Sequence, residues 1–140
     1  MTRIFLVLLT LTFIMPLSYG QSKPNIDSVI LNSTQPSYSK LTFLSDCEKA
    51  KDIAEHDIGT NNMRLFIIGG IAPVTYSGDD AFERRYRIKY YDYGCISPRN
   101  ECLQLYNSTI FQHLYIMYGK SWKHKVRPDV VGLKKYKRKR

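Results

Sequence analysis

Cysteines and histidines are the residues of this chain best suited to chemistry, and it has three of each. Cys95 and Cys102 lie close together in the sequence, so a disulfide between them would close a short loop. We expect that pairing, with Cys47 left as a buried thiol. A bond from Cys47 to either of the other two is the alternative. A nucleophilic thiol needs a histidine placed as its base, and no local signature supplies one, so we predict no catalytic residue.

The histidines do not form a metal-binding pattern. His56, His113 and His124 are too widely spaced to form an HxH or i, i+4 pair, and none stands beside a cysteine at zinc-finger spacing. We therefore predict no metal site, and we expect His113 to lie at the border of a helix's apolar stripe.

Acidic and glycine-rich positions also have simple structural explanations. Asp79, Asp80 and Glu83 lie where a short helix begins, so capping and favourable dipole interactions account for them. Gly69 and Gly70 end an apolar run, but no dinucleotide or P-loop glycine pattern follows. We predict no cofactor.

Positive charge is concentrated at the C-terminal end. The formal net charge is +9. Ten basic residues and one acid lie from Lys120 onward, whereas the rest of the chain holds equal numbers of both. The last seven residues form a nearly continuous cationic block: Lys134, Lys135, Tyr136, Lys137, Arg138, Lys139 and Arg140. Because like charges repel, we expect this block to be unfolded on its own.

Two interpretations of this cationic block remain open. It is either a solvated end or a contact with an anionic partner: acidic lipid, lipopolysaccharide or an acidic protein. In the second case Tyr136 would sit at the interface. Nucleic acid has suitable chemistry but is not expected as the partner of an exported protein.

The N-terminus has the pattern of a secretory signal. Arg3 precedes the apolar run 4–15, which is followed by Pro16 and the small residues Ser18 and Gly20. The run is shorter than the ~20 residues that span a bilayer. We therefore predict a cleaved signal peptide over 1–20, not a transmembrane anchor. The mature protein would be periplasmic or extracellular, with no transmembrane anchor.

Hydrophobic patterning then divides the mature chain. Residues 21–40 are rich in Ser, Asn, Gln and Pro and predict a leader or loosely attached strand, not a helix. A capping box at Ser45–Glu48 predicts a helix that reaches Ile58. The remaining signals predict a strand at 65–68, a short helix at 81–85, a strand at 87–93 and a long helix at 101–118.

These elements predict one domain over 41–133, followed by the basic tail 134–140. The expected fold is α+β, or a small α/β layer, with a short sheet of two to three strands packed by three to four helices. A helix separates the two strands, so we expect them to be parallel. A third strand would come from 26–31 or from 129–133.

One stretch resembles a known family. Phe82-Glu83-Arg84-Arg85-Tyr86 is similar to the F-E-K-K-Y signature of FEKKY-domain proteins, with both lysines replaced by arginine. Segments 90–95, 118–122 and 127–132 also resemble that pattern, so the resemblance covers roughly 64–133. It implies a small exported domain of a Bacteroidota-like bacterium and implies no activity. Phe82 and Tyr86 stand at i, i+4, which predicts packing on the sheet, with Glu83, Arg84 and Arg85 in solvent.

The sequence thus predicts an exported, non-catalytic binding domain whose basic tail contacts anionic surfaces. The alternative is a secreted hydrolase whose site is assembled only in the fold, from His113, Asp92 or a cysteine. A structural or inhibitory partner of another exported protein is a third hypothesis. Asn32 and Asn107 begin glycosylation sequons, which in a bacterium we interpret as chance; in a eukaryotic source Asn32 would be the expected acceptor.

Overall fold

The computed structural model describes residues 25–138, so the predicted signal peptide, Lys139 and Arg140 lie outside the described residues. The elements follow in the order α1 (Ile26–Leu31), α2 (Ser37–Phe43), the 3₁₀ helix η1 (Cys47–Lys49), α3 (Ala50–Gly59), β1 (Arg64–Ile67), α4 (Asp79–Tyr86), β2 (Lys89–Asp92), α5 (Asn100–Tyr118), the 3₁₀ helix η2 (Ser121–His124) and α6 (Leu133–Arg138). The α+β class is confirmed, with more helices than expected.

The two strands form a parallel pair, as expected, with α4 as the crossover. Arg64 pairs with Lys89 and Ile67 with Asp92. Neither predicted source of a third strand supplies one. Residues 26–31 are helical, and the segment around Val130 makes only an isolated antiparallel bridge to Ile67.

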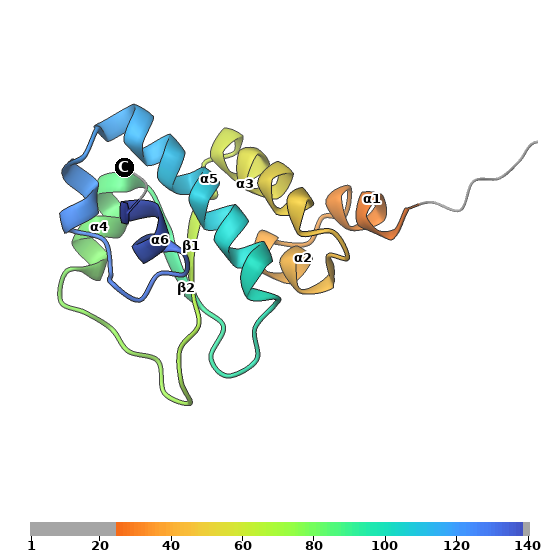
Figure 1. Ribbon diagram of the computed structural model, residues 1–140, viewed down its shortest axis with the longest axis horizontal. Coiled ribbons are helices and arrows are strands. Elements are labelled where there is room, and N and C mark those ends of the chain that lie inside the picture. Colours follow the sequence, from red (N-terminus) through yellow and green to blue (C-terminus); the bar gives the residue numbers. More distant parts are fainter. Residues whose placement is uncertain (1–24, 139–140) are drawn as a thin grey trace, which may run out of the picture.

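The core lies where α5 crosses the sheet. Figure 1 shows α5 running through the middle of the molecule, with α1, α2 and α3 on one side and the strands, α4 and α6 on the other. Leu65, Phe66 and Ile67 are all buried, which explains why β1 is apolar at consecutive positions: both of its faces are covered. The buried stripe of α5 includes Leu103, Tyr106, Ile110, Phe111 and Leu114.

The N-terminal segment is a helix pair, not a leader. Leu41 on α2 is 1% exposed and belongs to the core. The carboxylate of Asp27 on α1 accepts hydrogen bonds from the Ser45 amide at 2.9 Å, the Ser45 hydroxyl at 2.8 Å and the Asp46 amide at 2.9 Å. The prediction of a leader or loosely attached strand is wrong, because contacts with residues distant in the sequence stabilise α1 and α2, which are too short to form alone.

The same contacts change the expected capping box. Ser45 is engaged by Asp27, and the side chain of Asp46, not Ser45, caps η1 by accepting from the Glu48 amide at 3.0 Å. The helix is nevertheless present as η1 followed by α3, and it ends at Gly59, close to the predicted end.

The disulfide joins Cys47 to Cys102, so the expected Cys95–Cys102 pairing is wrong and the alternative is the observed one. Cys102 lies on the buried side of α5 with its Cα 4.5 Å from that of Cys47 on η1. Cys95 is exposed in the loop after β2. The physical reason is that helix packing turns Cys102 toward η1 and away from this loop.

Candidate functional site

The cationic block is largely a folded helix. Residues 133–138 form α6, so the prediction of an unfolded tail beginning at 134 is wrong for the described part. Leu133 is 1% exposed, and the Tyr136 ring packs 5.2 Å from that of Phe111 and 6.0 Å from that of Trp122. Tyr136 is therefore partly buried and packs against the core. Two apolar side chains at i, i+3 hold the helix against the body.

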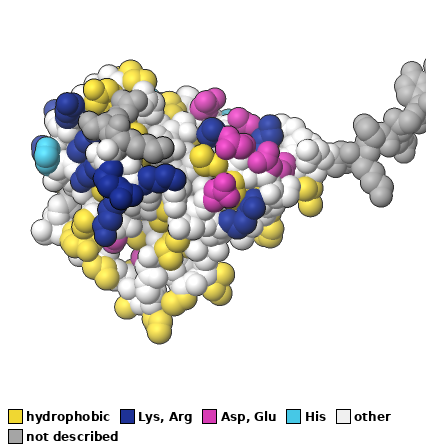
Figure 2. Space-filling model, in the orientation of Figure 1, with side chains coloured by type: hydrophobic (Ala, Val, Ile, Leu, Met, Phe, Trp, Pro, Cys, Tyr) yellow, Lys and Arg dark blue, Asp and Glu magenta, His cyan; other side chains and the backbone are white. Residues whose placement is uncertain are grey.

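The opposite side of α6 presents its charges to solvent. We call the exposed side chains of Lys134, Lys135, Lys137 and Arg138 the basic face. Figure 2 shows basic side chains gathered over α6, with the acidic ones mostly over a different part of the visible surface. Within residues 25–138, no ion pair involves any of the four side chains of the basic face. Its charge is thus available to a partner.

A second surface feature is apolar. Ile71 is 97% exposed and Ile96 is 87% exposed, on the loops that follow β1 and β2. Together with their exposed neighbours they form what we call the apolar tip: Ile68, Ile71, Val74, Tyr76 and Ile96. Because the carboxyl ends of parallel strands meet at one edge, the two loops project together, at the lower end of Figures 1 and 2. The structure thus leaves several large apolar side chains in water at one end of the molecule.

Asp92 holds the two loops of the tip together. Its Oδ1 accepts from the Gly69 amide on one loop and from the Gly94 amide on the other, each at 2.8 Å. A side chain at Gly69 would collide with this carboxylate and displace it from the two amides. Asp92 is therefore a structural brace, not the free acid that the hydrolase hypothesis requires.

A buried arginine ties the tip to the C-terminal segment. Arg127 is 7% exposed and donates from Nη1 to the Val74 carbonyl at 2.8 Å and to Asp79 at 3.1 Å. It also forms a bidentate pair with Asp129, at 3.0 and 2.7 Å. Its guanidinium lies 4.7 Å from the Tyr76 ring centroid.

The charges around Arg127 support one another. The side-chain hydrogen bond from Arg127 lowers the pKa of Asp129, and the reciprocal contact raises the pKa of Arg127. Asp79 lies in the first turn of α4, as the dipole argument expects, but it does not cap the helix: its carboxylate accepts from the Tyr76 amide at 2.9 Å and pairs with Arg127. Local sequence could not reveal this cluster, because it joins two segments, 74–79 and 127–129, whose contact between Arg127 and Asp79 spans 48 positions.

The family-like motif mostly packs. Phe82 and Tyr86 are each 2% exposed, with ring centroids 4.6 Å apart, as predicted. Arg84 and Arg85 are exposed, also as predicted. Glu83 departs from the prediction, because it accepts from the amide of the β2 residue Tyr90 at 2.9 Å and from Lys89 Nζ at 2.7 Å. The chain turns back after α4, and this brings β2 beneath the Glu83 carboxylate.

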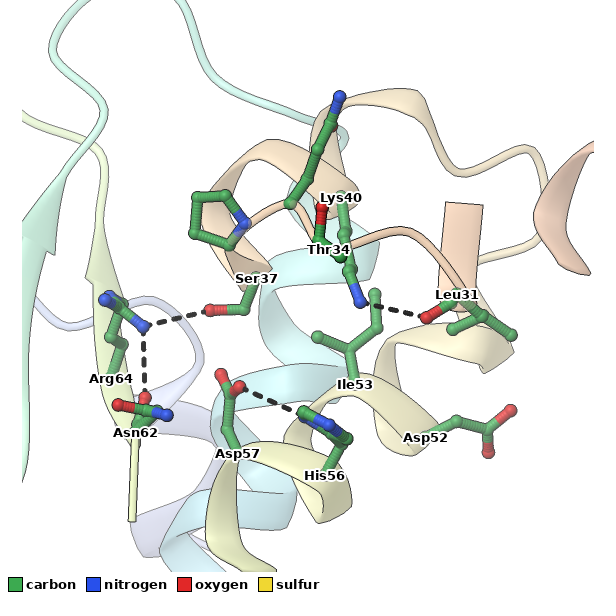
Figure 3. A pocket seen from close by; sticks show the side chains of 12 residues that line it. Leu31, Thr34, Ser37, Lys40, Asp52, Ile53, His56, Asp57, Asn62 and Arg64 are labelled. Atoms are coloured by element: carbon green, nitrogen blue, oxygen red, sulfur yellow. Dashed lines mark hydrogen bonds and ion pairs between the residues drawn. The ribbon is translucent and has the colours of Figure 1, made fainter. Parts of the chain in front are cut away.

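A polar cleft lies on the other side of α5. It has a volume of about 440 Å³ and is lined by α2, α3, the α1–α2 connection and the start of β1. Figure 3 shows Arg64 and Lys40 on opposite sides of the cleft, with Ser37 and Asp57 between them and His56 beside Asp57. Two cations, two carboxylates and a histidine therefore face one space: Lys40, Arg64, Asp52, Asp57 and His56.

Asp57 is a buried carboxylate in this cleft. It is 5% exposed, and its Oδ2 accepts from the Tyr106 hydroxyl at 2.5 Å. The imidazole of His56 lies 3.8 Å from Oδ1. Burial, followed by the charge of Asp57, raises the pKa of Tyr106, so this phenol remains a hydrogen-bond donor.

The other residues considered for chemistry are not assembled into a reactive site. Cys47 and Cys102 are bonded to each other, and Asp92 is engaged by backbone amides. His113 is partly buried on α5, at the border position expected of it. Within residues 25–138, no group of three or more His, Cys, Asp or Glu is placed to hold a metal ion.

Comparison with known proteins adds no assignment. No family model matches the chain, and neither any curated protein nor any solved structure does. Across residues 25–138, no helix combines the length and hydropathy required to cross a bilayer.

Proposed function

We propose that this protein is an exported, non-catalytic docking domain that attaches to anionic phospholipid bilayers through the basic face. The observation that carries the proposal is a row of cations that form no ion pair with any described residue, on a helix fixed by Leu133 and Tyr136. A fixed helix does not lose conformational freedom on binding as an unfolded tail would. Near an anionic leaflet each Lys or Arg adds about 1 kcal/mol.

The apolar tip favours a bilayer over a purely charged partner. An Ile side chain gains about 1.5–3 kcal/mol when it leaves water. Ile71 and Ile96 remain almost fully in water in the free protein. Figure 2 shows the basic side chains over α6 and the apolar side chains below them on one visible face. A surface with anionic headgroups above an apolar interior matches both features.

Export is supported by the N-terminal pattern and by the resemblance to FEKKY-domain proteins. The Cys47–Cys102 disulfide is compatible with it, since disulfides persist in oxidising compartments. Fractionation of the cells that produce the protein would test whether it is exported. A protein that begins near residue 21 in the periplasm or medium is the expected result, and an unprocessed cytosolic chain would contradict it.

The basic face is tested with phosphatidylglycerol vesicles and phosphatidylcholine vesicles in a flotation assay over a salt series. The test variant carries Lys→Gln at 134, 135 and 137 and Arg138→Gln. The control variant loses the same charge elsewhere, through Lys49→Gln, Lys51→Gln, Arg84→Gln and Arg85→Gln. We expect the wild-type and control proteins to float with the anionic vesicles at low salt. The α6 variant should no longer float with them. Equal flotation of the two variants would overturn the proposal.

The apolar tip is tested separately, at a salt concentration that weakens the electrostatic contact. Ile71→Ser with Ile96→Ser should reduce flotation about tenfold or more, because the inserted side chains are lost. The matched control is Ile26→Ser with Ile116→Ser, since these residues are 63% and 68% exposed but lie outside the tip. If the two pairs behave alike, the bilayer proposal fails. In that case, binding of the wild type to an acidic protein or to lipopolysaccharide would identify a different occupant.

A further inference from the structure

We infer that the polar cleft binds a small organic carboxylate that also carries hydrogen-bond donors, such as a sugar acid or an amino acid. This binding does not depend on attachment to lipid. The inference rests on two cations that face the cleft and have no carboxylate partner among the residues 25–138, and on a buried carboxylate placed between them.

Lys40 is the first of these cations. It is 7% exposed, and the hydrogen bond found for its ammonium is to the Leu31 carbonyl at 2.9 Å. Within residues 25–138, no carboxylate lies within ion-pair distance of its Nζ. Burying an ammonium is costly unless a counter-charge accompanies it. An anion in the cleft would supply this counter-charge. It would accept hydrogen bonds from the N–H groups of Lys40 that do not bond the Leu31 carbonyl.

Arg64 is the second cation, at the opposite side of the cleft. Its Nη1 donates to the Ser37 hydroxyl at 3.3 Å and to the Asn62 carbonyl at 3.1 Å, both neutral acceptors. The guanidinium lies over the Tyr38 ring, 5.4 Å from its centroid. Among the described residues no acid pairs with it, so its remaining donors fit a carboxylate oxygen.

Asp57 determines what else the ligand must carry. Tyr106 donates to one of its oxygens, and the other faces His56 at 3.8 Å, beyond a good hydrogen bond. A second anionic group beside Asp57 would be repelled, whereas a hydroxyl or ammonium would be held. With Ile53 as an apolar wall, the cleft of about 440 Å³ suits a molecule of monosaccharide or amino-acid size.

The test follows backbone amide signals by nuclear magnetic resonance during titration with three probes at equal ionic strength: glucuronate, glutamate and glucose. We expect glucuronate or glutamate to shift the signals of cleft residues at millimolar concentration, with glucose inactive. A response to glucuronate alone identifies a sugar-acid site, and a response to glutamate alone identifies an amino-acid site. No response to either, or an equal response to glucose, overturns the inference.

Variants establish which residues bind the probe. Lys40→Met and Arg64→Met should each weaken binding about tenfold or more, because each removes a charge-assisted hydrogen bond. Lys51→Met, on the exposed side of α3, is the matched control and should bind as the wild type does. Because Lys40 also donates to the Leu31 carbonyl, a thermal melting curve is needed to check that the Lys40→Met variant is folded. Arg64→Lys keeps the charge and should bind with intermediate affinity. Equal affinity of the Lys40, Arg64 and Lys51 variants would reject the site.

Discussion

Asp27 attaches the N-terminal helix pair to the rest of the domain with one carboxylate. Its oxygens accept from two backbone amides and one hydroxyl at the turn that precedes η1. The hydrogen bond from the Ser45 amide is the main cause of the lowered pKa of Asp27 and outweighs the opposing effect of its burial. The charged form is therefore favoured in the folded state more than in the unfolded chain.

This lowered pKa predicts an acid-sensitive domain. A carboxyl whose pKa is depressed by folding stabilises the protein above its unfolded pKa of about 3.9, and that contribution is lost as the pH falls through the folded value. Asp27→Asn should lower the free energy of unfolding at pH 7 and flatten its decline in acid. Urea unfolding at a series of pH values measures this, with the exposed Asp80→Asn as control. An unchanged acid limb in Asp27→Asn would contradict the assignment.

Asn107 shows what residue types alone do not reveal. In the sequence it marks only a sequon, yet in the fold it is 0% exposed. Its Oδ1 accepts from the Phe66 amide at 3.0 Å, and its Nδ2 donates to the carbonyls of Phe66 at 2.9 Å and Val131 at 3.0 Å. The side-chain amide thus bonds the backbone amide and carbonyl of Phe66 as a neighbouring strand would. This explains how the backbone of β1 is satisfied there without a third strand. Only the assembled fold brings these partners together.

Among the elements, those with strong patterns were predicted well. The apolar run of β1, the alternation of β2 and the long stripe of α5 each carry their own periodic signal, so the two strands and the main helix lie where expected. The short helices α1, α2 and α6 carry little signal. Contacts from other elements stabilise them, as Tyr136 does for α6, and such contacts cannot be inferred from local sequence.

The Cys47–Cys102 disulfide is a covalent link between two elements and should stabilise the fold. It links η1 to α5 across 55 positions of sequence. Closing a loop of that length restricts the unfolded chain and should contribute about 2–4 kcal/mol. Cys47→Ala with Cys102→Ala should lower the free energy of unfolding by this amount, measured by denaturant titration under non-reducing conditions. Cys95→Ala is the matched control and should change little, because this thiol is exposed. Similar losses in both proteins would argue against the observed pairing.

At the scale of the whole molecule, the basic C-terminus belongs to both the core and the surface. Leu133 and Tyr136 complete the packing around Phe111 and Trp122, while the neighbouring cations stay outside. Removing the charges of α6 therefore affects the surface alone, whereas removing the segment also takes away core contacts.

This difference is measurable by thermal unfolding. Ending the chain at Leu133 removes Tyr136 and should lower the melting temperature by roughly 3–8 °C, because its core contacts are lost. The four charge-to-Gln changes on α6 keep Tyr136 and should leave the melting temperature near that of the wild type or slightly above it, since they relieve repulsion. Equal melting temperatures for the truncated and full-length proteins would show that α6 adds nothing to the fold.

Trp122 gives the protein an intrinsic fluorescent reporter. It is the single tryptophan of the chain, fully buried and stacked on Phe111 at 5.4 Å. Its indole nitrogen has no hydrogen-bond partner among the described residues, so its emission should be shifted to the blue. Tyr136 packs beside it, so release of α6 would admit water and shift the emission to the red. A spectrum recorded on vesicles therefore distinguishes attachment with α6 in place from attachment that pulls α6 away, without any added label.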